Sequence, residues 1–180
     1  MKHELWDAYD RNGKRLGFDL VRGEPLPEGA WHLVADIFSV TADGRVLLTK
    51  RHPDKPWGNH WEYTGGSVLK GETPLQGALR ELREETGLTA TAEGLHPVYV
   101  EARMGIDGCP SIYHSFFHVF DDNTQTIRLQ AEETTAYQLL PYAEFQEFIW
   151  RDEFVEPLRQ RFLDHQPAYD RLVALLTGRQ

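Results

Sequence analysis

Short segments rich in β-branched and aromatic residues alternate with turn residues over much of the chain. Such segments predict β-strands, because these side chains pack well on a pleated, half-buried surface. The pairs Asn12-Gly13 and Asp43-Gly44 are of the type that joins neighbouring antiparallel strands in a hairpin. The predicted strands are residues 5–10, 15–21, 32–40, 45–50, 98–103, 111–120 and 134–140.

The clearest helical pattern covers residues 74–86. Thr73 can cap this helix, Pro74 suits its first position, and Gln76 completes a capping box with Thr73. Gly87 then supplies the left-handed residue that ends it. Apolar residues at three- and four-residue steps predict that one face packs against a core; they are Leu75, Ala78, Leu79 and Leu82.

The segment from Tyr142 onward is also helical in pattern, with apolar residues at three- and four-residue steps. Strands before and after a central helix, followed by more helices, predict mixed α/β layers around one core. We expect residues 1–30 to form a small N-terminal β-hairpin extension and residues 31–180 to form the main domain. The pattern does not decide whether the hairpin is an accessory element or a dimer contact.

The glutamates of the central helix are grouped on one side. At about 100° per residue, Glu81, Glu84 and Glu85 fall together beside the apolar face. Like charges three or four residues apart destabilise a helix, and only Glu84 has a basic residue at that spacing, Arg80. An ordinary solvated surface is the alternative interpretation. The grouping favours a cation from outside the helix, and carboxylate oxygens suit Mg²⁺ or Mn²⁺.

The residues around these glutamates form a longer pattern between Gly66 and Leu88, GSVLKGETPLQGALRELREETGL. Its fixed positions resemble the signature of the Nudix hydrolases; they are Gly66, Glu72, Arg80, Glu81, Leu82, Glu84, Glu85, Gly87 and Leu88. The resemblance implies an α/β/α sandwich with a mixed sheet. It also implies a Mg²⁺-dependent pyrophosphohydrolase, with Mn²⁺ as a substitute, acting on a small-molecule diphosphate. Dimers are common among relatives, so a homodimer is a further expectation.

The same resemblance assigns roles to individual residues. The expected metal ligands are Glu81, Glu84, Glu85 and the carbonyl oxygen of Gly66. Glu133, or Glu132 beside it, is a candidate for the acidic residue that often joins the site from outside the motif. Glu72 and Arg80 are expected to support the site by pairing with each other. Which glutamate takes the proton of the attacking water stays open.

Candidate substrate-binding residues lie outside the motif. Arg51 ends a predicted strand beside Lys50, His52 and Lys55, and this positive charge is a candidate phosphate-binding site. Trp31 is a candidate platform for a nucleobase, and Trp57, Trp61 and Tyr63 are alternatives. The structural interpretation is that the basic residues are solvated and the aromatic residues belong to the core.

Composition narrows the class of protein. An apolar fraction of 41% is typical of a folded globular chain, and a net charge of −9 argues against binding to nucleic acid or an anionic membrane. The single cysteine, Cys109, excludes an internal disulfide framework. The first residues lack the apolar run of a signal peptide, and no run of about 18 apolar residues occurs. We therefore expect a cytoplasmic protein.

Two alternative functions stay open. Residues 5–10 and His32-Leu33 resemble the isopentenyl-diphosphate isomerase branch of the same fold. That branch is expected to have a catalytic cysteine close to Gly65 and a metal-binding histidine close to Ser67, and this chain has neither. The second alternative is a non-catalytic domain that senses a nucleotide, although such domains typically lose a motif glutamate. The sequence does not identify the substrate.

Overall fold

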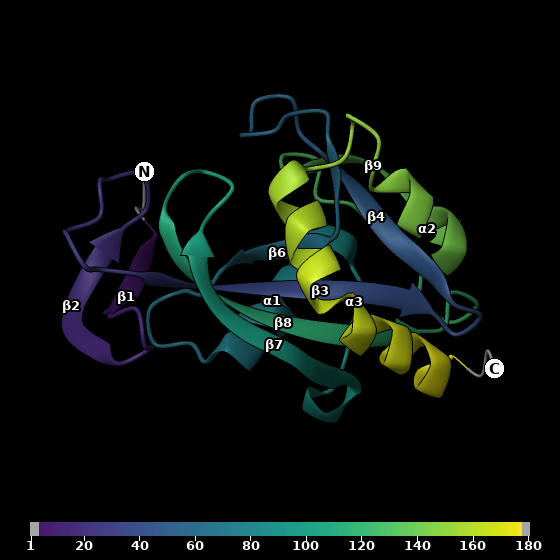
Figure 1. Cartoon of the computed structure of the whole chain (residues 1–180), viewed down its shortest axis with the longest axis horizontal. Helices are drawn as coiled ribbons and strands as arrows, with labels where there is room; N and C mark the ends of the chain where they lie inside the picture. The colour runs from purple at the N-terminus through teal and green to yellow at the C-terminus, as the bar shows by residue number, and fades with distance from the viewer. Residues whose placement is uncertain (1–3, 178–180) are drawn as a thin grey trace.

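A seven-stranded mixed sheet lies at the centre of the computed structural model, which describes residues 4–177 (Figure 1). Five strands follow the order β5-β4-β3-β8-β7, while β6 pairs with β3 and β9 pairs with β4. The pair β3 and β8 is parallel, and the other pairs in this sheet are antiparallel. The strands are β3 (His32–Thr41), β4 (Arg45–Arg51), β5 (Trp61–Glu62), β6 (Thr64–Ser67), β7 (Leu95–Met104), β8 (Pro110–Phe120) and β9 (Thr134–Pro141).

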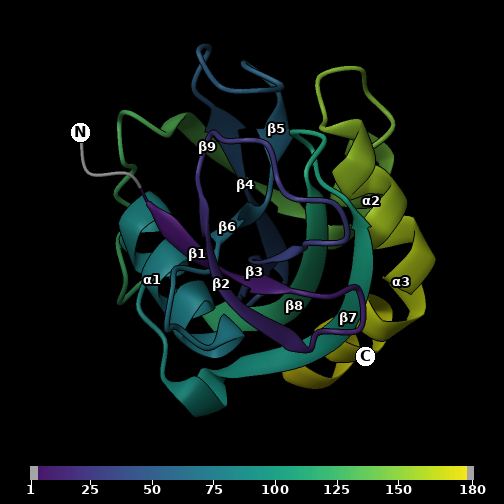
Figure 2. The same ribbon diagram turned by 90° about the vertical axis from the view of Figure 1, so that its left-hand side faces the viewer.

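Helices cover both faces of the sheet, which confirms the predicted α/β/α sandwich (Figure 2). Helix α1 (Pro74–Thr86) lies on one face, and α2 (Tyr142–Phe148) and α3 (Glu156–Leu176) lie on the other. The alternation of side chains along β3 supplies both cores. Ala35 and Ile37 pack in the cluster under α1, whereas Phe38 and Val40 pack with aromatic residues of α2 and α3.

The central helix has the predicted ends. The Thr73 hydroxyl accepts a hydrogen bond from the Gln76 backbone N–H at 3.3 Å, and the Gln76 side chain accepts one from the Thr73 N–H at 2.8 Å. Gly87 takes the left-handed conformation with φ 71°. Ala78 and Leu82 are fully buried, so the predicted apolar face is the buried one.

The C-terminal region differs from a simple helical continuation, because residues 149–155 separate α2 from α3. The backbone of this segment forms hydrogen bonds with β5 instead. The Trp61 N–H donates to the Glu153 carbonyl at 2.7 Å, and the Val155 N–H donates to the Trp61 carbonyl at 3.0 Å. These tertiary bonds satisfy backbone groups that helical periodicity assigns to the helix itself. A 3₁₀ turn (Ala92–Gly94) also precedes β7, which begins three residues earlier than predicted.

The predicted N-terminal hairpin is present as β1 (Leu5–Tyr9) and β2 (Arg15–Val21), an antiparallel pair separate from the main sheet. It is attached through Trp6, whose ring stacks on His32 at 4.2 Å, and through two backbone bonds between Tyr9 and Trp31. The Asp7 carboxylate also accepts a hydrogen bond from the Gly71 N–H at 2.9 Å. The hairpin therefore contacts the loop before α1. A domain boundary at residue 30 stays a prediction.

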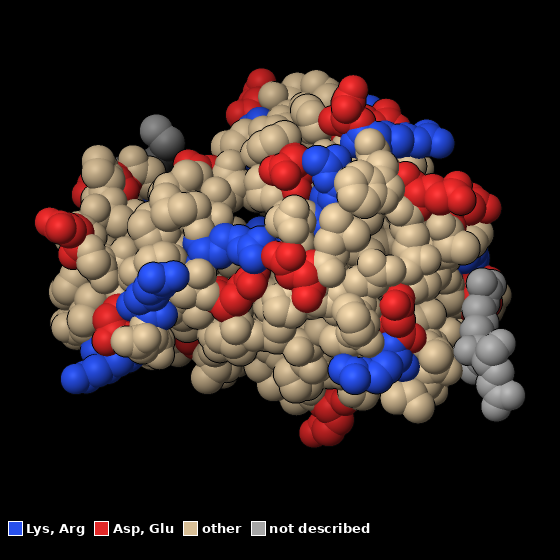
Figure 3. Space-filling view, viewed as in Figure 1, with Lys and Arg blue, Asp and Glu red and all other residues tan. Residues whose placement is uncertain are grey.

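Surface charge is mixed on the face seen in Figure 3, where basic and acidic side chains alternate. None of the helices within residues 4–177 is sufficiently long and apolar to cross a lipid bilayer.

Candidate active site

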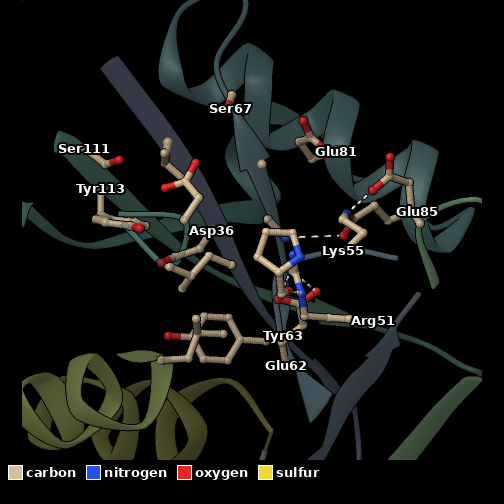
Figure 4. Close-up of a pocket in the computed structure, with 18 of the residues that line it drawn as sticks. Asp36, Arg51, Lys55, Glu62, Tyr63, Ser67, Glu81, Glu85, Ser111 and Tyr113 are labelled. Atoms are coloured by element: carbon tan, nitrogen blue, oxygen red, sulfur yellow. Dashed lines mark hydrogen bonds and ion pairs between the residues drawn. The ribbon is translucent and has the colours of Figure 1, made fainter. Parts of the chain in front are cut away.

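One cavity of about 230 Å³ contains most of the residues that the motif predicts. Figure 4 shows Glu81 and Glu85 on helix α1 at one side, Ser111 and Tyr113 at the other, and Asp36 between them. We call the first side the α1 end and define it by Arg80, Glu81, Glu84, Glu85, Lys55 and Glu133. We call the second the α3 end and define it by Asp36, Tyr63, Tyr113 and Arg161.

The three helix glutamates differ in exposure. The Glu84 side chain is 44% exposed, the Glu81 side chain is 14% exposed, and Glu85 is buried beside β6. The Glu85 carboxylate accepts a long hydrogen bond of 3.4 Å from the Gly65 N–H. Glu85 therefore lies at the border between the helix core and the cavity rather than on a solvated face.

The glycine pair before the helix allows this approach of backbone and carboxylates. A Cβ atom at residue 66 would overlap the carboxylate of Glu81, and one at residue 65 would lie 2.8 Å from the Ala35 carbonyl oxygen. A side chain at residue 65 is therefore excluded by the backbone of β3, whereas one at residue 66 would displace the Glu81 carboxylate. The Gly66 backbone lines the cavity beside Glu81, where a metal-ligand role was predicted for it.

Arg80 connects the motif loop to the helix. Its guanidinium donates to both oxygens of Glu72, at 2.9 and 3.0 Å, and to the Ser67 carbonyl at 2.9 Å. It also donates to Glu81 at 2.7 Å and to Glu84 at 3.1 Å. The predicted pairing of Arg80 with Glu72 and Glu84 is confirmed. Glu81 was expected to lack a basic neighbour, and its contact with Arg80 corrects this expectation. The expectation considered only residues three or four positions away, whereas Arg80 is adjacent and its side chain turns along the helix.

Burial and mutual repulsion perturb these carboxylates. Burial raises the pKa of Glu85 well above its ordinary value, and Glu81 and Glu62 raise it further while Lys55 opposes them. Burial also raises the pKa of Glu81, against the opposing charge of Arg80. Both shifts mean that this end of the cavity accommodates negative charge poorly on its own. A cation bound among these carboxylates would relieve that cost.

Arg51 has a different environment from the one predicted. It lines the cavity, but it is 5% exposed and donates to both oxygens of Glu62, at 2.7 and 2.6 Å. Its Nε donates to the Pro56 carbonyl at 2.6 Å. Its charge is thus compensated by Glu62, and it holds the loop of residues 52–60. The predicted contact with a substrate phosphate stays a prediction.

Lys55 and Glu133 come from loops far apart in the sequence and form an ion pair at the α1 end. This arrangement brings Glu133 into the same cavity as the helix glutamates, as its predicted role requires. Lys55 was expected only as one basic residue of its loop. It is the cation that opposes the pKa rise of Glu85, which places its charge within reach of the glutamates.

Trp31 does not reach the cavity. It is bridged to Tyr9 and packs against the core under α1, and the Arg11 guanidinium lies 5.8 Å from its ring. The residues that line the cavity do not include it. The structure thus favours a packing role over the predicted base platform.

The α3 end contains charged residues that the sequence interpretation missed. Arg161 on α3 is 2% exposed, its guanidinium lies 3.8 Å from the Tyr113 ring centroid, and its Nη2 is 3.5 Å from Asp36. Burial raises the pKa of Asp36, while Arg161 opposes the rise. A signal was present: Asp36 interrupts an apolar strand, and Arg161 interrupts the apolar series of Leu158 and Phe162.

Comparison with known proteins gives the family. The NUDIX domain family model matches residues 30–162, more than half of the chain. The chain belongs to the Nudix family.

Relatives of this Nudix chain are named as hydrolases. It is 40% identical over 93 residues to an uncharacterised Nudix hydrolase of Listeria monocytogenes, covering 51% of this chain and 55% of the relative. The chain spans about half the length of this relative and of a second uncharacterised Nudix hydrolase, from Listeria innocua.

Solved structures show the same fold. DR0079 from Deinococcus radiodurans has a TM-score of 0.69 at 20% identity, covering 87% of this chain and 98% of that one. A bifunctional NMN adenylyltransferase/ADP ribose pyrophosphatase from Francisella tularensis, complexed with AMP and a manganese ion, has a TM-score of 0.59 at 21% identity. The match covers 84% of this chain and 43% of that one.

The residues of this Nudix chain fit a hard divalent cation in chemistry. Carboxylate and carbonyl oxygens line the α1 end, and the buried Glu85 lacks an ion-pair partner among residues 4–177. Within the same residues, no three acidic, histidine or cysteine side chains already form a complete ligand group. Arg80 and Lys55 hold several of the carboxylates. Metal binding therefore requires Glu81, Glu84 and Glu133 to exchange these partners.

Proposed function

We propose that this Nudix chain is a pyrophosphohydrolase that cleaves the diphosphate linkage of a nucleoside diphosphate derivative with Mg²⁺ or Mn²⁺. The observation that carries the proposal is the buried Glu85 beside Glu81, facing the Gly65-Gly66 backbone in one cavity. The family of hydrolases to which the chain belongs supports it. The manganese and AMP bound by the Francisella protein support the choice of metal and substrate class.

Each residue of the α1 end has a role in this proposal. Glu81, Glu84, Glu85, Glu133 and the Gly66 carbonyl would hold the metal. Bound metal supplies neutralisation of the phosphate oxygens and a water of lowered pKa. Arg80 fixes the helix glutamates against the motif loop through Glu72, so it acts as a positioning residue.

Lys55 contributes a second source of positive charge. Lys55 is paired with Glu133 in the structure. If Glu133 held a metal, the Lys55 ammonium would be free to face the phosphates. Charge neutralisation of the diphosphate is the main requirement of this reaction, because the negative oxygens repel an attacking nucleophile. One of the glutamates would take the proton of the attacking water.

A substrate panel tests the proposal. Purified protein is incubated with Mg²⁺ and with nucleoside diphosphates, nucleoside triphosphates, dinucleotides, sugar nucleotides and isopentenyl diphosphate. We expect phosphate-containing products from at least one nucleotide and none after chelation of the metal. Folded protein that releases no product from any nucleotide contradicts the proposal. Isomerised isopentenyl diphosphate would favour the isomerase alternative, and tight binding without cleavage would favour a sensing domain.

A further inference from the structure

The α3 end holds buried polar atoms without partners. Among residues 4–177, no hydrogen-bond partner is present for Nε and Nη1 of Arg161, for Oδ1 of Asp36 or for the Tyr63 hydroxyl. All three side chains line the cavity. Buried polar groups are almost always hydrogen-bonded, because an unpaired one has lost its bonds to water without replacing them. Unpaired polar atoms of residues that line a cavity indicate a place where a ligand completes the bonds, once the side chains turn these atoms toward it.

Attachment of α3 to the sheet does not account for this cluster. The contact between Arg161 and Asp36 is 3.5 Å long, which is weak for a charged pair. The helix is already attached by the aromatic core, in which Phe162 and Tyr169 pack against Phe38 at 5.8 and 4.7 Å between ring centroids. An apolar residue in place of a buried ion pair is often neutral or stabilising, so packing alone does not require these charges.

The unpaired atoms define the chemistry of the missing group. Arg161 and Tyr63 offer donors, whereas Oδ1 of Asp36 offers an acceptor. An additional anion would satisfy Arg161 but would bring negative charge next to Asp36. An apolar chain would leave all of these atoms unpaired. A neutral group that presents both an acceptor and a donor satisfies both sides, and nucleobases and sugar hydroxyls share this property.

We propose that Arg161, Asp36 and Tyr63 bind the uncharged, hydrogen-bonding group that the substrate carries beyond its diphosphate, a nucleobase or a sugar. The inference rests on the proposed function for the orientation of the substrate, with the diphosphate at the α1 end of the same cavity. It selects among substrates, because a site built to hydrogen-bond a polar group rejects an analogue that lacks the group. Isoprenoid diphosphates are thereby excluded as good substrates.

The test measures binding without catalysis. Metal-free protein labelled with ¹⁵N is titrated with adenosine, cytidine, guanosine, uridine and ribose, and separately with inorganic phosphate and isopentenyl diphosphate. The Nε–H signal of Arg161 is followed by NMR. We expect at least one nucleoside or ribose to shift this signal and to bind in the millimolar range. Nucleosides without ribose binding identify the base, and ribose binding identifies the sugar.

Variants separate binding from folding. Tyr63→Phe removes only an unpaired hydroxyl, so it should fold and bind the same probe about ten-fold more weakly. Arg161→Lys keeps the charge and should show a similar loss. Arg159→Gln is the matched control, because Arg159 lies on the same helix, does not line the cavity and pairs with Glu156 at 3.8 Å. It should bind the probe as the wild type does.

Three results would overturn the inference: no neutral probe binds the wild type, only phosphate or isopentenyl diphosphate shifts the Arg161 signal, or Tyr63→Phe binds unchanged. None of these depends on hydrolysis, so an inactive but binding protein contradicts only the proposed function. If hydrolysis is found, Tyr63→Phe should raise KM for the nucleotide more than it lowers kcat.

Discussion

Each end of the cavity contains an arginine with little exposure, and the two arginines differ in their hydrogen-bond partners. Arg80 donates to Glu72, Glu81, Glu84 and a backbone carbonyl at 2.7–3.1 Å. Arg161 lies 3.5 Å from Asp36 and 3.8 Å from the Tyr113 ring centroid, and two of its nitrogens have no hydrogen-bond partner among residues 4–177. The hydrogen bonds of Arg80 at the α1 end are therefore satisfied, whereas those of Arg161 at the α3 end are not.

This difference separates residues that hold the site together from residues that bind a ligand. A fully bonded network holds its members in one arrangement, and its loss should lower the free energy of unfolding. An incomplete buried network costs stability in the free protein and is relieved only by a ligand. In the same way, the excess negative charge at the α1 end costs stability that a bound metal ion would relieve. Variants at both ends of the cavity should respond differently.

Glu85→Gln should lower kcat by about 10²-fold or more, because a site loses one electrostatic element. The metal-free variant should be no less stable than the wild type, since the change removes a buried carboxylate that Glu81 and Glu62 repel. Steady-state kinetics with Mg²⁺ and thermal unfolding with a chelator provide the two measurements. A metal-free variant that melts clearly earlier would show that Glu85 is structural.

Arg80→Gln should lower the free energy of unfolding by about 2 kcal/mol, the scale of losing hydrogen bonds to charged groups. Mg²⁺ should restore part of that loss, because it neutralises Glu81 and Glu84. Tyr63→Phe is the counterpart at the α3 end and should cost no stability, since its hydroxyl has no partner within residues 4–177. Chemical denaturation of both variants checks the contrast, and equal losses would refute it.

Gly66→Ala should reduce kcat/KM about ten-fold or more, because the added Cβ displaces the Glu81 carboxylate and small misplacements are costly in catalysis. Gly94→Ala is the matched control, since a Cβ there would meet its nearest neighbour at an ordinary 3.6 Å. Circular dichroism should show both variants folded. Full activity of Gly66→Ala would mean that Glu81 can move without consequence.

The pH dependence of stability should separate the cavity from the rest of the core. Burial lowers the pKa of His118 to about 4, so the unfolded chain takes up this proton first as the pH falls. The free energy of unfolding should therefore decrease between about pH 6.5 and about pH 4, by roughly 1 kcal/mol or more at pH 5. Asp36 acts oppositely: its raised folded pKa adds stability as the pH falls through that value.

His118→Asn should remove the part of this acid-induced loss that His118 contributes, because asparagine does not titrate. Burial also lowers the pKa of His32 to about 4, so His32 should keep its own part of the loss. The measurement is the slope of unfolding free energy against pH, which is independent of any constant cost of the substitution. An unchanged slope between wild type and variant would show that His118 does not contribute. The remaining slope should then report the buried groups of the cavity.

Local features of the sequence predicted much of the fold. Thr73, Gln76 and Gly87 specify the ends of α1 through contacts within a few residues, and these ends are confirmed. The seven predicted strands are confirmed with small shifts of their ends, since alternation of side chains is a local property, whereas β5 and β6 were not predicted. Several C-terminal helices were expected, but the position of the break between α2 and α3 was not predicted, because its backbone bonds go to Trp61, far away in the sequence.

The motif predicted the α1 end better than it predicted the substrate contacts. The pair of Arg80 and Glu72 was expected and is present. Arg51 was a candidate phosphate contact, and Glu62 compensates its charge in the structure. Trp31 was a candidate base platform, and it packs against the core. A sequence shows which residues are charged or aromatic, but it does not show which other residue each side chain contacts.

The capped helix, seven of the strands and the group of glutamates can be predicted from the chain, because caps, spacing and alternation act between near neighbours. Which charged side chains meet depends on how the chain folds. Lys55 and Glu133 are 78 positions apart, and Asp36 and Arg161 are 125 apart. The first pair forms when two loops meet beside the sheet and the second when α3 packs on the sheet, and no local preference encodes either pair. The physical reason is that electrostatic contacts depend on distance in space, and packing sets that distance.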